Sequence, residues 1–199
     1  MIYEEYLKVI KNHPVTESLC LIPVSVDSGP RLGRLPLTVF KLTDKTSKFI
    51  RIPATGINPY GHQEVPVVSI YSAFIGNENV TDIVLTSNIR EISRRAFSGC
   101  RKLARITIPK NVRVIEKDTF KDCDSLTDVY YEGSKEEWDR IVIEDSERVT
   151  EFGDVIPGTS VREIKSDRLV HLTGNDPLRM ATIHFNCGLE FDGSLLFVM

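Results

Sequence analysis

The chain has 199 residues, of which 41% are hydrophobic and 27% charged, as in an ordinary globular protein. Its formal net charge of −3 shows no basic excess, so neither nucleic acid nor an anionic membrane is indicated as a partner. No apolar run reaches the ~18 residues of a membrane-spanning helix, so we expect no membrane insertion.

The first residues predict an amphipathic helix. Ile2, Tyr6 and Ile10 share one helical face, and Pro14 follows where the pattern stops. Two glutamates stand where a secretory signal needs positive charge, so the segment is not typical of a signal peptide. We therefore expect a cytoplasmic protein, with the cell surface or secretion by an unrecognised route as the alternative.

Strand-like runs follow over residues 18–26, 35–43 and 47–52, with turn residues between them. Together with the helix they predict an N-terminal helix-plus-β-meander cap, assigned to residues 1–48. A repeat protein needs such a cap because an uncovered end coil exposes its apolar interior and an unpaired strand edge.

From residue 80 the chain repeats itself at an offset of 23 residues, as between Ile83 and Ile106. Equivalent positions carry similar residues, in the sets Val80, Leu103 and Leu126; Leu85, Ile108 and Tyr131; Phe97 and Phe120; Cys100 and Cys123. An imperfect copy ending at Phe74 is one residue shorter, which predicts a register slip. A fixed period of about 20–29 residues with apolar positions in phase is the pattern of a leucine-rich solenoid.

Two further polar patterns predict structural roles. Asn88 and Asn111 lie one period apart directly after the strands, so we expect an amide ladder that satisfies backbone groups at the turns. The run from Ser134 to Glu137 is a capping box, which predicts a helix that contains Trp138.

The repeat that carries a resemblance to a known family reads Ile83-x-Leu85-x-x-x-Ile89-x-x-Ile92-x-x-x-Ala96-Phe97-x-x-Cys100-x-x-Leu103. It resembles the BspA-type leucine-rich repeat, and residues 130–138 and 181–186 are similar to the C-terminal closing unit of that family. The resemblance implies an α/β solenoid, a short right-handed leucine-rich-repeat coil with parallel strands on one face and a C-terminal capping unit. It covers about residues 49–143 and 181–186.

The expected organisation has four parts. An insertion separates the tryptophan helix from the closing strand, and strand-like runs occur within it at 161–164 and 169–172. The parts are the N-terminal cap at 1–48, the repeats and tryptophan helix at 49–143, the insertion at 144–180, and the closing strand and tail at 181–199.

Residue types that support catalysis do not fall into a catalytic pattern. The histidines lack metal-ligand spacing, the cysteines form no CxxC pair, and the chain has no phosphate-cradling glycine loop. We therefore expect no enzyme, no metal and no cofactor, with an enzyme site in the unmatched flanks as a minor alternative. Cys100 and Cys123 hold the same phase on neighbouring coils, so a disulfide is within reach, although buried thiols are the favoured interpretation.

The outward strand positions form the candidate partner-binding face, because residues alternate in direction along a strand. The face comprises Asp82, Arg105 and Asp128 in one row, and Val84, Thr107 and Tyr130 in the next. The first row alternates in sign and can pair with itself across the sheet. The second row is an uncharged strip suited to a protein partner.

The size of this face limits what it can bind. Three or four rungs provide about 200–300 Å², whereas a stable interface needs roughly 800 Å² from each partner. Either the binding is weak, or the insertion, the cap or a second copy of the chain, as a homo-oligomer, contributes. The expected function is a non-catalytic protein–protein interaction module of a bacterial cell, and the alternative is an adhesin-like protein that binds host or matrix proteins.

Overall fold

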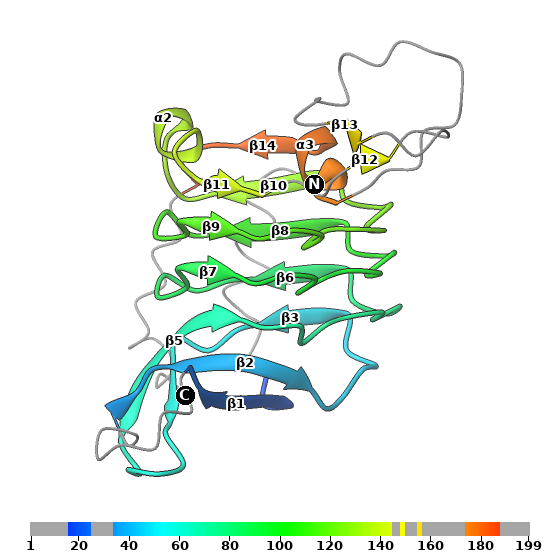
Figure 1. Cartoon of the computed structure of the whole chain (residues 1–199). Helices are drawn as coiled ribbons and strands as arrows, with labels where there is room; N and C mark the ends of the chain where they lie inside the picture. Colours follow the sequence, from blue (N-terminus) through cyan, green and yellow to red (C-terminus); the bar gives the residue numbers. More distant parts are fainter. Residues whose placement is uncertain (1–15, 25–33, 145–147, 150–154, 157–173, 188–199) are drawn as a thin grey trace.

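A computed structural model describes residues 16–24, 34–144, 148–149, 155–156 and 174–187 (Figure 1). The helix expected in the first residues and the strands expected at 161–164 and 169–172 lie outside the described residues. The described chain winds into a stack of coils, and successive coils add strands to two sheets. This stack confirms the solenoid that the 23-residue period predicts.

One sheet carries the strands that open each repeat. Within the described residues it has five strands, in the order β14-β10-β8-β6-β3. They are β3 (Phe49–Arg51), β6 (Asp82–Val84), β8 (Arg105–Ile108), β10 (Asp128–Tyr131) and β14 (Thr182–His184). All neighbours run parallel and β6, β8 and β10 pair residues that are one period apart, so equivalent side chains form continuous rows.

The return limbs of the coils build the other sheet, which has seven strands within the described part of the chain. Its path is β1 (Leu19–Pro23), β2 (Leu37–Leu42), β5 (Glu64–Ile70), β7 (Glu91–Ile92), β9 (Val114–Ile115) and β11 (Val142–Ile143), with β4 (Thr55–Ile57) beside β5. The parallel sheet predicted for one face is confirmed by the five-stranded sheet, and the second sheet on the return limbs was not predicted. The return limbs are also extended and stacked in phase, with Ile92 opposite Ile115, so they pair as well.

The predicted N-terminal meander is wrong for its third strand. β1 and β2 form an antiparallel pair, but β2 then pairs in parallel with β5. β3 does not pair with β2 but belongs to the five-stranded sheet, where Ile50 lies opposite Ile83. Ile50 is fully buried in the core, so burial of its side chain favours a place as the first rung over a place in a meander.

β4 and β5 form an antiparallel hairpin that the sequence analysis did not predict. The side chain of Asn58 supports its turn by accepting a hydrogen bond from the backbone N–H of Tyr60 over 2.9 Å. Beyond the hairpin the register slip is confirmed. Ile70 lies opposite Ile92, 22 positions on, whereas Ile92 and Ile115 are 23 apart.

Three phenylalanines fill the interior of successive coils. The ring centroids of Phe74 and Phe97 are 5.5 Å apart, and those of Phe97 and Phe120 are 5.4 Å apart. Each ring is at most 2% exposed, so the stacked interior is confirmed. The amide ladder is confirmed as well, since Asn88 donates to the carbonyl of Ala54 and Asn111 to that of Ser87.

Two helices lie at the C-terminal end of the stack. In α2 (Lys135–Trp138) the capping box is formed as predicted, and the Trp138 ring meets Tyr131 edge-on at 5.1 Å. α3 (Asp176–Met180) places Leu178, which is fully buried, in the core. Between them, β12 (Arg148–Val149) and β13 (Val155–Ile156) form an antiparallel pair. The region assigned as an insertion therefore ends in a helix that belongs to the core.

Candidate partner-binding surfaces

The structure brings the six predicted face residues together on the five-stranded sheet. Asp82 lies opposite Arg105, and Arg105 lies opposite Asp128. The other row pairs Val84 with Thr107 and Thr107 with Tyr130. The positions of both rows are therefore as predicted, and their exposure decides what they can contact.

The charged row pairs with itself in part. Arg105 forms an ion pair with Asp82 through Nε and Oδ1, which are 2.5 Å apart. On the next rung the Asp128 carboxylate meets Nε2 of His184 at 2.8 Å and accepts a hydrogen bond from the Thr127 hydroxyl. Burial by itself would raise the pKa of Asp128, but the bonds from His184 and Thr127 and the nearby positive charges outweigh it, so this pKa is lowered.

The uncharged row is not the exposed strip that was expected. Val84 and Thr107 are 0% exposed and Tyr130 is 3% exposed, and burial also raises the pKa of the Tyr130 phenol. Among the described residues, Cys187 and Phe49 pack against this row from beyond the repeats. The prediction of an accessible apolar contact line is therefore wrong for this conformation.

His184 is a face residue that the sequence analysis did not select. It lies on β14 next to Tyr130, and the two rings stack with centroids 4.8 Å apart. Its side chain is 38% exposed, and Asp128 beside it is 32% exposed. A search at the 23-residue period cannot find it, because the insertion separates β14 from β10. Its bond to Asp128 gives the His184 imidazole a structural partner.

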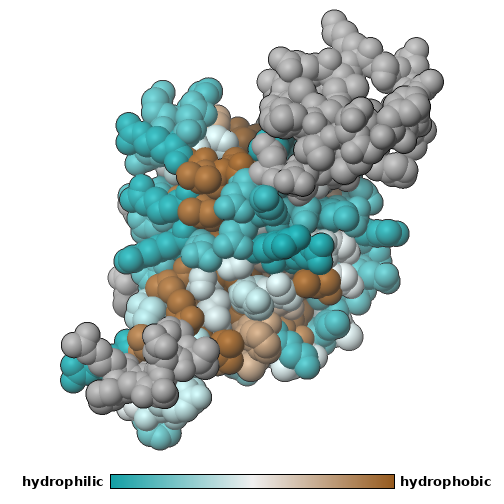
Figure 2. Space-filling model, viewed as in Figure 1, coloured by the Kyte–Doolittle hydropathy of each residue, from teal (hydrophilic) through white to brown (hydrophobic). Residues whose placement is uncertain are grey.

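A separate group of exposed aromatic residues lies on the seven-stranded sheet. Phe40 of β2 and Tyr71, which follows β5, stack with centroids 6.1 Å apart although they are 45% and 53% exposed. Figure 2 shows hydrophobic surface over this β2–β5 end of the molecule and again near β9 and β11, between bands of hydrophilic side chains. Val142 of β11 is also exposed, at 57%.

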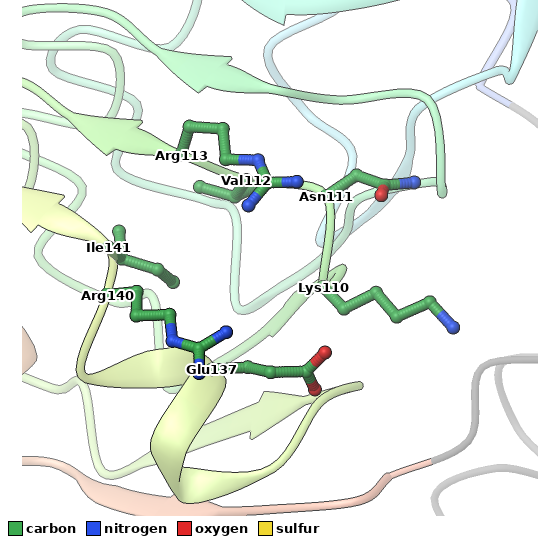
Figure 3. A pocket seen from close by; sticks show the side chains of 7 residues that line it. All are labelled: Lys110, Asn111, Val112, Arg113, Glu137, Arg140 and Ile141. Carbon is green, nitrogen blue, oxygen red and sulfur yellow. The ribbon is translucent and has the colours of Figure 1, made fainter.

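A polar pocket of about 260 Å³ lies between the turn that follows β8 and helix α2 (Figure 3). Its lining residues are Lys110, Asn111, Val112, Arg113, Glu137, Arg140 and Ile141. Three of them are cations and one is an acid. Within the described residues, none of these three cations forms an ion pair. The 23-residue period does not reveal this pocket, because α2 interrupts the repeat there.

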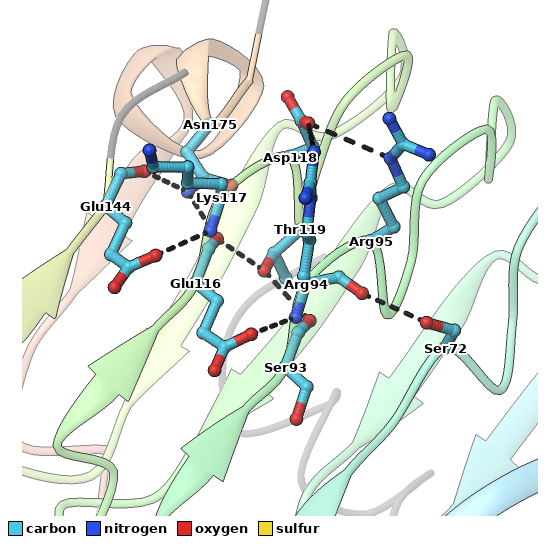
Figure 4. Close-up of polar contacts among 10 residues, drawn as sticks. All are labelled: Ser72, Ser93, Arg94, Arg95, Glu116, Lys117, Asp118, Thr119, Glu144 and Asn175. Carbon is cyan, nitrogen blue, oxygen red and sulfur yellow. Dashed lines mark hydrogen bonds and ion pairs between the residues drawn. The ribbon is translucent and has the colours of Figure 1, made fainter. Parts of the chain in front are cut away.

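Glutamate side chains link successive coils at the edge shown in Figure 4. The backbone N–H of Arg94 donates to Glu116 over 2.7 Å, and that of Lys117 donates to Glu144 over 3.3 Å. Asp118 lies 3.8 Å from the nearest guanidinium nitrogen of Arg94. These charged groups are therefore engaged in holding coils together.

The buried cysteines have a similar structural role. Cys100 donates its thiol hydrogen to the carbonyl of Phe74 over 3.1 Å, and Cys123 donates to that of Phe97 over 3.2 Å. Burial raises the pKa of Cys100 to about 12 and raises that of Cys123 further. All four cysteines of the chain are free, so the structure agrees with buried thiols and contains no Cys100–Cys123 disulfide.

Neither a metal site nor a membrane-spanning helix occurs among the described residues. No group of three or more His, Cys, Asp or Glu side chains in this part of the chain could hold a metal ion. None of the helices described is both long and apolar enough to cross a membrane.

Stacked 23-residue coils with an apolar interior define a leucine-rich-repeat solenoid. The family model described as "BspA type Leucine rich repeat region" matches the sequence in six copies over residues 67–167. The chain therefore belongs to the BspA-type leucine-rich repeat family.

Similar solved structures include three bacterial leucine-rich repeat proteins. That of T. pallidum is 24% identical over 58% of this chain and 51% of its own, with a TM-score of 0.46. That of Bacteroides ovatus is 27% identical over 59% and 30%, with a TM-score of 0.45. That of Bacteroides capillosus is 22% identical over 64% and 99%, with a TM-score of 0.46.

The aligned part of the chain thus spans about half the length of the first of these proteins and under a third of the second. Among curated proteins, none matches the sequence.

Proposed function

We propose that the protein is a non-catalytic module for protein–protein contact in a bacterial cell. The observation that carries the proposal is the BspA-type repeat, matched over residues 67–167. Stacked repeats present extended surfaces that suit the binding of other proteins. The non-catalytic part of the proposal is supported by the titratable groups described above. His184, Glu116 and Glu144 each form a hydrogen bond to another part of the fold and so have structural roles.

The partner contact that we propose combines two surfaces. On the predicted face, Arg105 and Asp128 keep accessible side chains, while Asp82, Val84, Thr107 and Tyr130 are buried beneath or beside them. A face of this size does not reach the roughly 800 Å² that a stable interface needs from each partner. The exposed Phe40–Tyr71 pair supplies the aromatic contact area that interface centres favour.

Affinity capture tests this function directly. The immobilised chain is incubated with a lysate of the native organism, and the wild type is compared with a Phe40→Ser/Tyr71→Ser double variant. Tyr60→Ser is the matched control, because Tyr60 is 62% exposed and lies on the β4–β5 hairpin. We expect one protein to be enriched saturably by the wild type and the control and to be lost with the double variant. If the wild type enriches no protein saturably, the proposed function is refuted.

We place the protein in the cytoplasm, with an adhesin-like location at the cell surface as the alternative. Its four free cysteines support a reducing compartment, because exported proteins commonly oxidise thiols that lie within reach of one another. Immunodetection in the soluble lysate, on intact cells and in culture supernatant separates the two locations. A signal on intact cells would refute the cytoplasmic assignment.

A further inference from the structure

The pocket beside α2 places two arginines on rigid supports. Arg113 is fixed through its backbone, which donates to the carbonyl of Arg90 and accepts from the N–H of Val142. Arg140 follows α2 and is held by a backbone bond to the carbonyl of Glu137. Figure 3 shows the two guanidinium groups on opposite sides of the same gap. The backbone positions from which the two arginine side chains reach the pocket are therefore set by the fold.

The charge of the pocket contrasts with that of the whole protein. The chain has a net charge of −3, yet the lining holds Lys110, Arg113 and Arg140 against Glu137 alone. One carboxylate oxygen of Glu137 already accepts the backbone N–H of Ser134 in the capping box, over 2.9 Å. Since none of the three cations is ion-paired within the described part of the chain, an incoming anion meets positive charge that the fold does not neutralise.

One wall of the pocket is apolar. Val112 is 2% exposed and Ile141 is 8% exposed, so the wall is continuous with the core. Ion pairs formed against an apolar wall are less screened than those formed in open solvent. A guanidinium presents a planar fork of donors that matches the two oxygens of a carboxylate.

We propose that this pocket binds aspartate or glutamate side chains of an acidic, extended segment of a partner protein. The proposal rests on the proposed protein-binding function and gives it a chemical class of ligand. A volume of about 260 Å³ admits individual side chains and excludes a folded domain. The lining contains no aromatic ring for base stacking, and the chain has no basic excess, so nucleic acid is not the ligand.

Titration of the full chain with a capped tetraglutamate peptide tests the pocket, observed by NMR through the arginine Nε–H signals of the wild type and through the backbone N–H signals of the pocket residues in every variant. We expect saturable shifts at Arg113 and Arg140. The double variant Arg113→Gln/Arg140→Gln should weaken binding severalfold and by about thirtyfold at most, since each of the two exposed pairs contributes up to about 1 kcal/mol. The matched control is Arg101→Gln/Lys102→Gln, which removes the same charge at exposed residues outside the pocket. Thermal melts check that both variants fold.

Several results would overturn the proposal. These are an absence of saturable shifts, equal weakening in the two double variants, and equal binding of a tetralysine peptide. Inorganic phosphate that binds at Arg113 and Arg140 as tightly as the peptide would refute the assignment to a polypeptide.

Capture from the lysate separates failure of the pocket from failure of the proposed function. Capture that survives Arg113→Gln/Arg140→Gln, although peptide binding is lost, refutes the role of the pocket and leaves protein binding intact. Peptide binding without any captured protein refutes the proposed function.

Discussion

Phe120 donates its backbone N–H to the side-chain oxygen of Asn175 over 3.1 Å. One coil earlier, Phe97 donates the equivalent N–H to the backbone carbonyl of Thr119 over 3.0 Å. Asn175 therefore supplies with its side chain the acceptor that a further coil supplies with its backbone, and so continues this row of backbone hydrogen bonds at the end of the stack.

Replacing Asn175 by alanine should lower the free energy of unfolding by about 2–4 kcal/mol. The side chain is buried and also donates to the carbonyls of Glu116 and Glu144, so three backbone groups lose a partner. Urea unfolding measures the loss. Asn111→Ala is the matched control, because that exposed amide makes one bond and should cost under about 1 kcal/mol. Equal losses in the two variants would contradict the capping role of Asn175.

Replacing a phenylalanine by alanine should lower the free energy of unfolding more in the buried stack than on the protein surface. Phe97 contacts a ring on each side and is fully buried, so we expect Phe97→Ala to cost about 3–5 kcal/mol. Phe40→Ala removes the same atoms from a ring that is 45% exposed and should cost under about 1 kcal/mol. Urea unfolding of both variants checks the difference, and a loss below about 1 kcal/mol at Phe97 would refute a continuous core.

The buried thiols should make folding sensitive to alkaline pH. The pKa values of Cys100 and Cys123 are raised above the unfolded value of about 8.5, so the neutral thiols favour the folded state below that pH. This contribution is lost as the pH rises from about 8.5 toward the folded pKa, which is about 12 for Cys100. Unfolding free energies measured at pH 7 and pH 10 should therefore fall more in the wild type than in Cys100→Ala/Cys123→Ala. Equal falls would show that other groups are responsible.

The same burial predicts slow thiol chemistry in the native protein. Ellman's reagent at pH 8 should modify the partly exposed Cys20 first and reach Cys100 and Cys123 only after unfolding. Mass spectrometry of the modified peptides identifies the sites. Rapid native labelling of Cys123 would contradict its burial.

The Asp128–His184 pair should respond at acidic pH. The folded pKa of Asp128 lies below its ordinary value, so the ionised carboxylate stabilises the fold above about pH 4. That contribution disappears as the pH falls through the lowered pKa. The stability difference between the wild type and Asp128→Asn should therefore narrow between pH 5 and pH 3 in urea unfolding experiments. A difference that stays constant would show that the charge of Asp128 does not contribute.

The periodic features of the molecule could be predicted from the sequence. The order of Phe97 and Phe120 in the core, the pairing of Ile83 with Ile106 and the amide ladder all follow from one spacing. A repeat places equivalent residues in equivalent surroundings, so a pattern found once along the chain applies to each coil. The capping box at Ser134 is local in the same sense, because its partner is three residues away.

Contacts between non-equivalent segments could not be predicted in this way. The burial of Val84 and Tyr130 depends on Cys187, and the pocket at Arg113 depends on Arg140, which lies beyond α2.

By itself, the sequence determined the stacked coils, their common interior and the family, because period and polarity act over short distances along the chain. Only the tertiary structure decided which faces of those coils remain exposed to solvent and where Asn175 ends the row of backbone hydrogen bonds. It also decided that Arg113 and Arg140 line one pocket. Those outcomes depend on where segments outside the repeat pack against the coils, and the spacing of residues within the repeat carries no information on that packing.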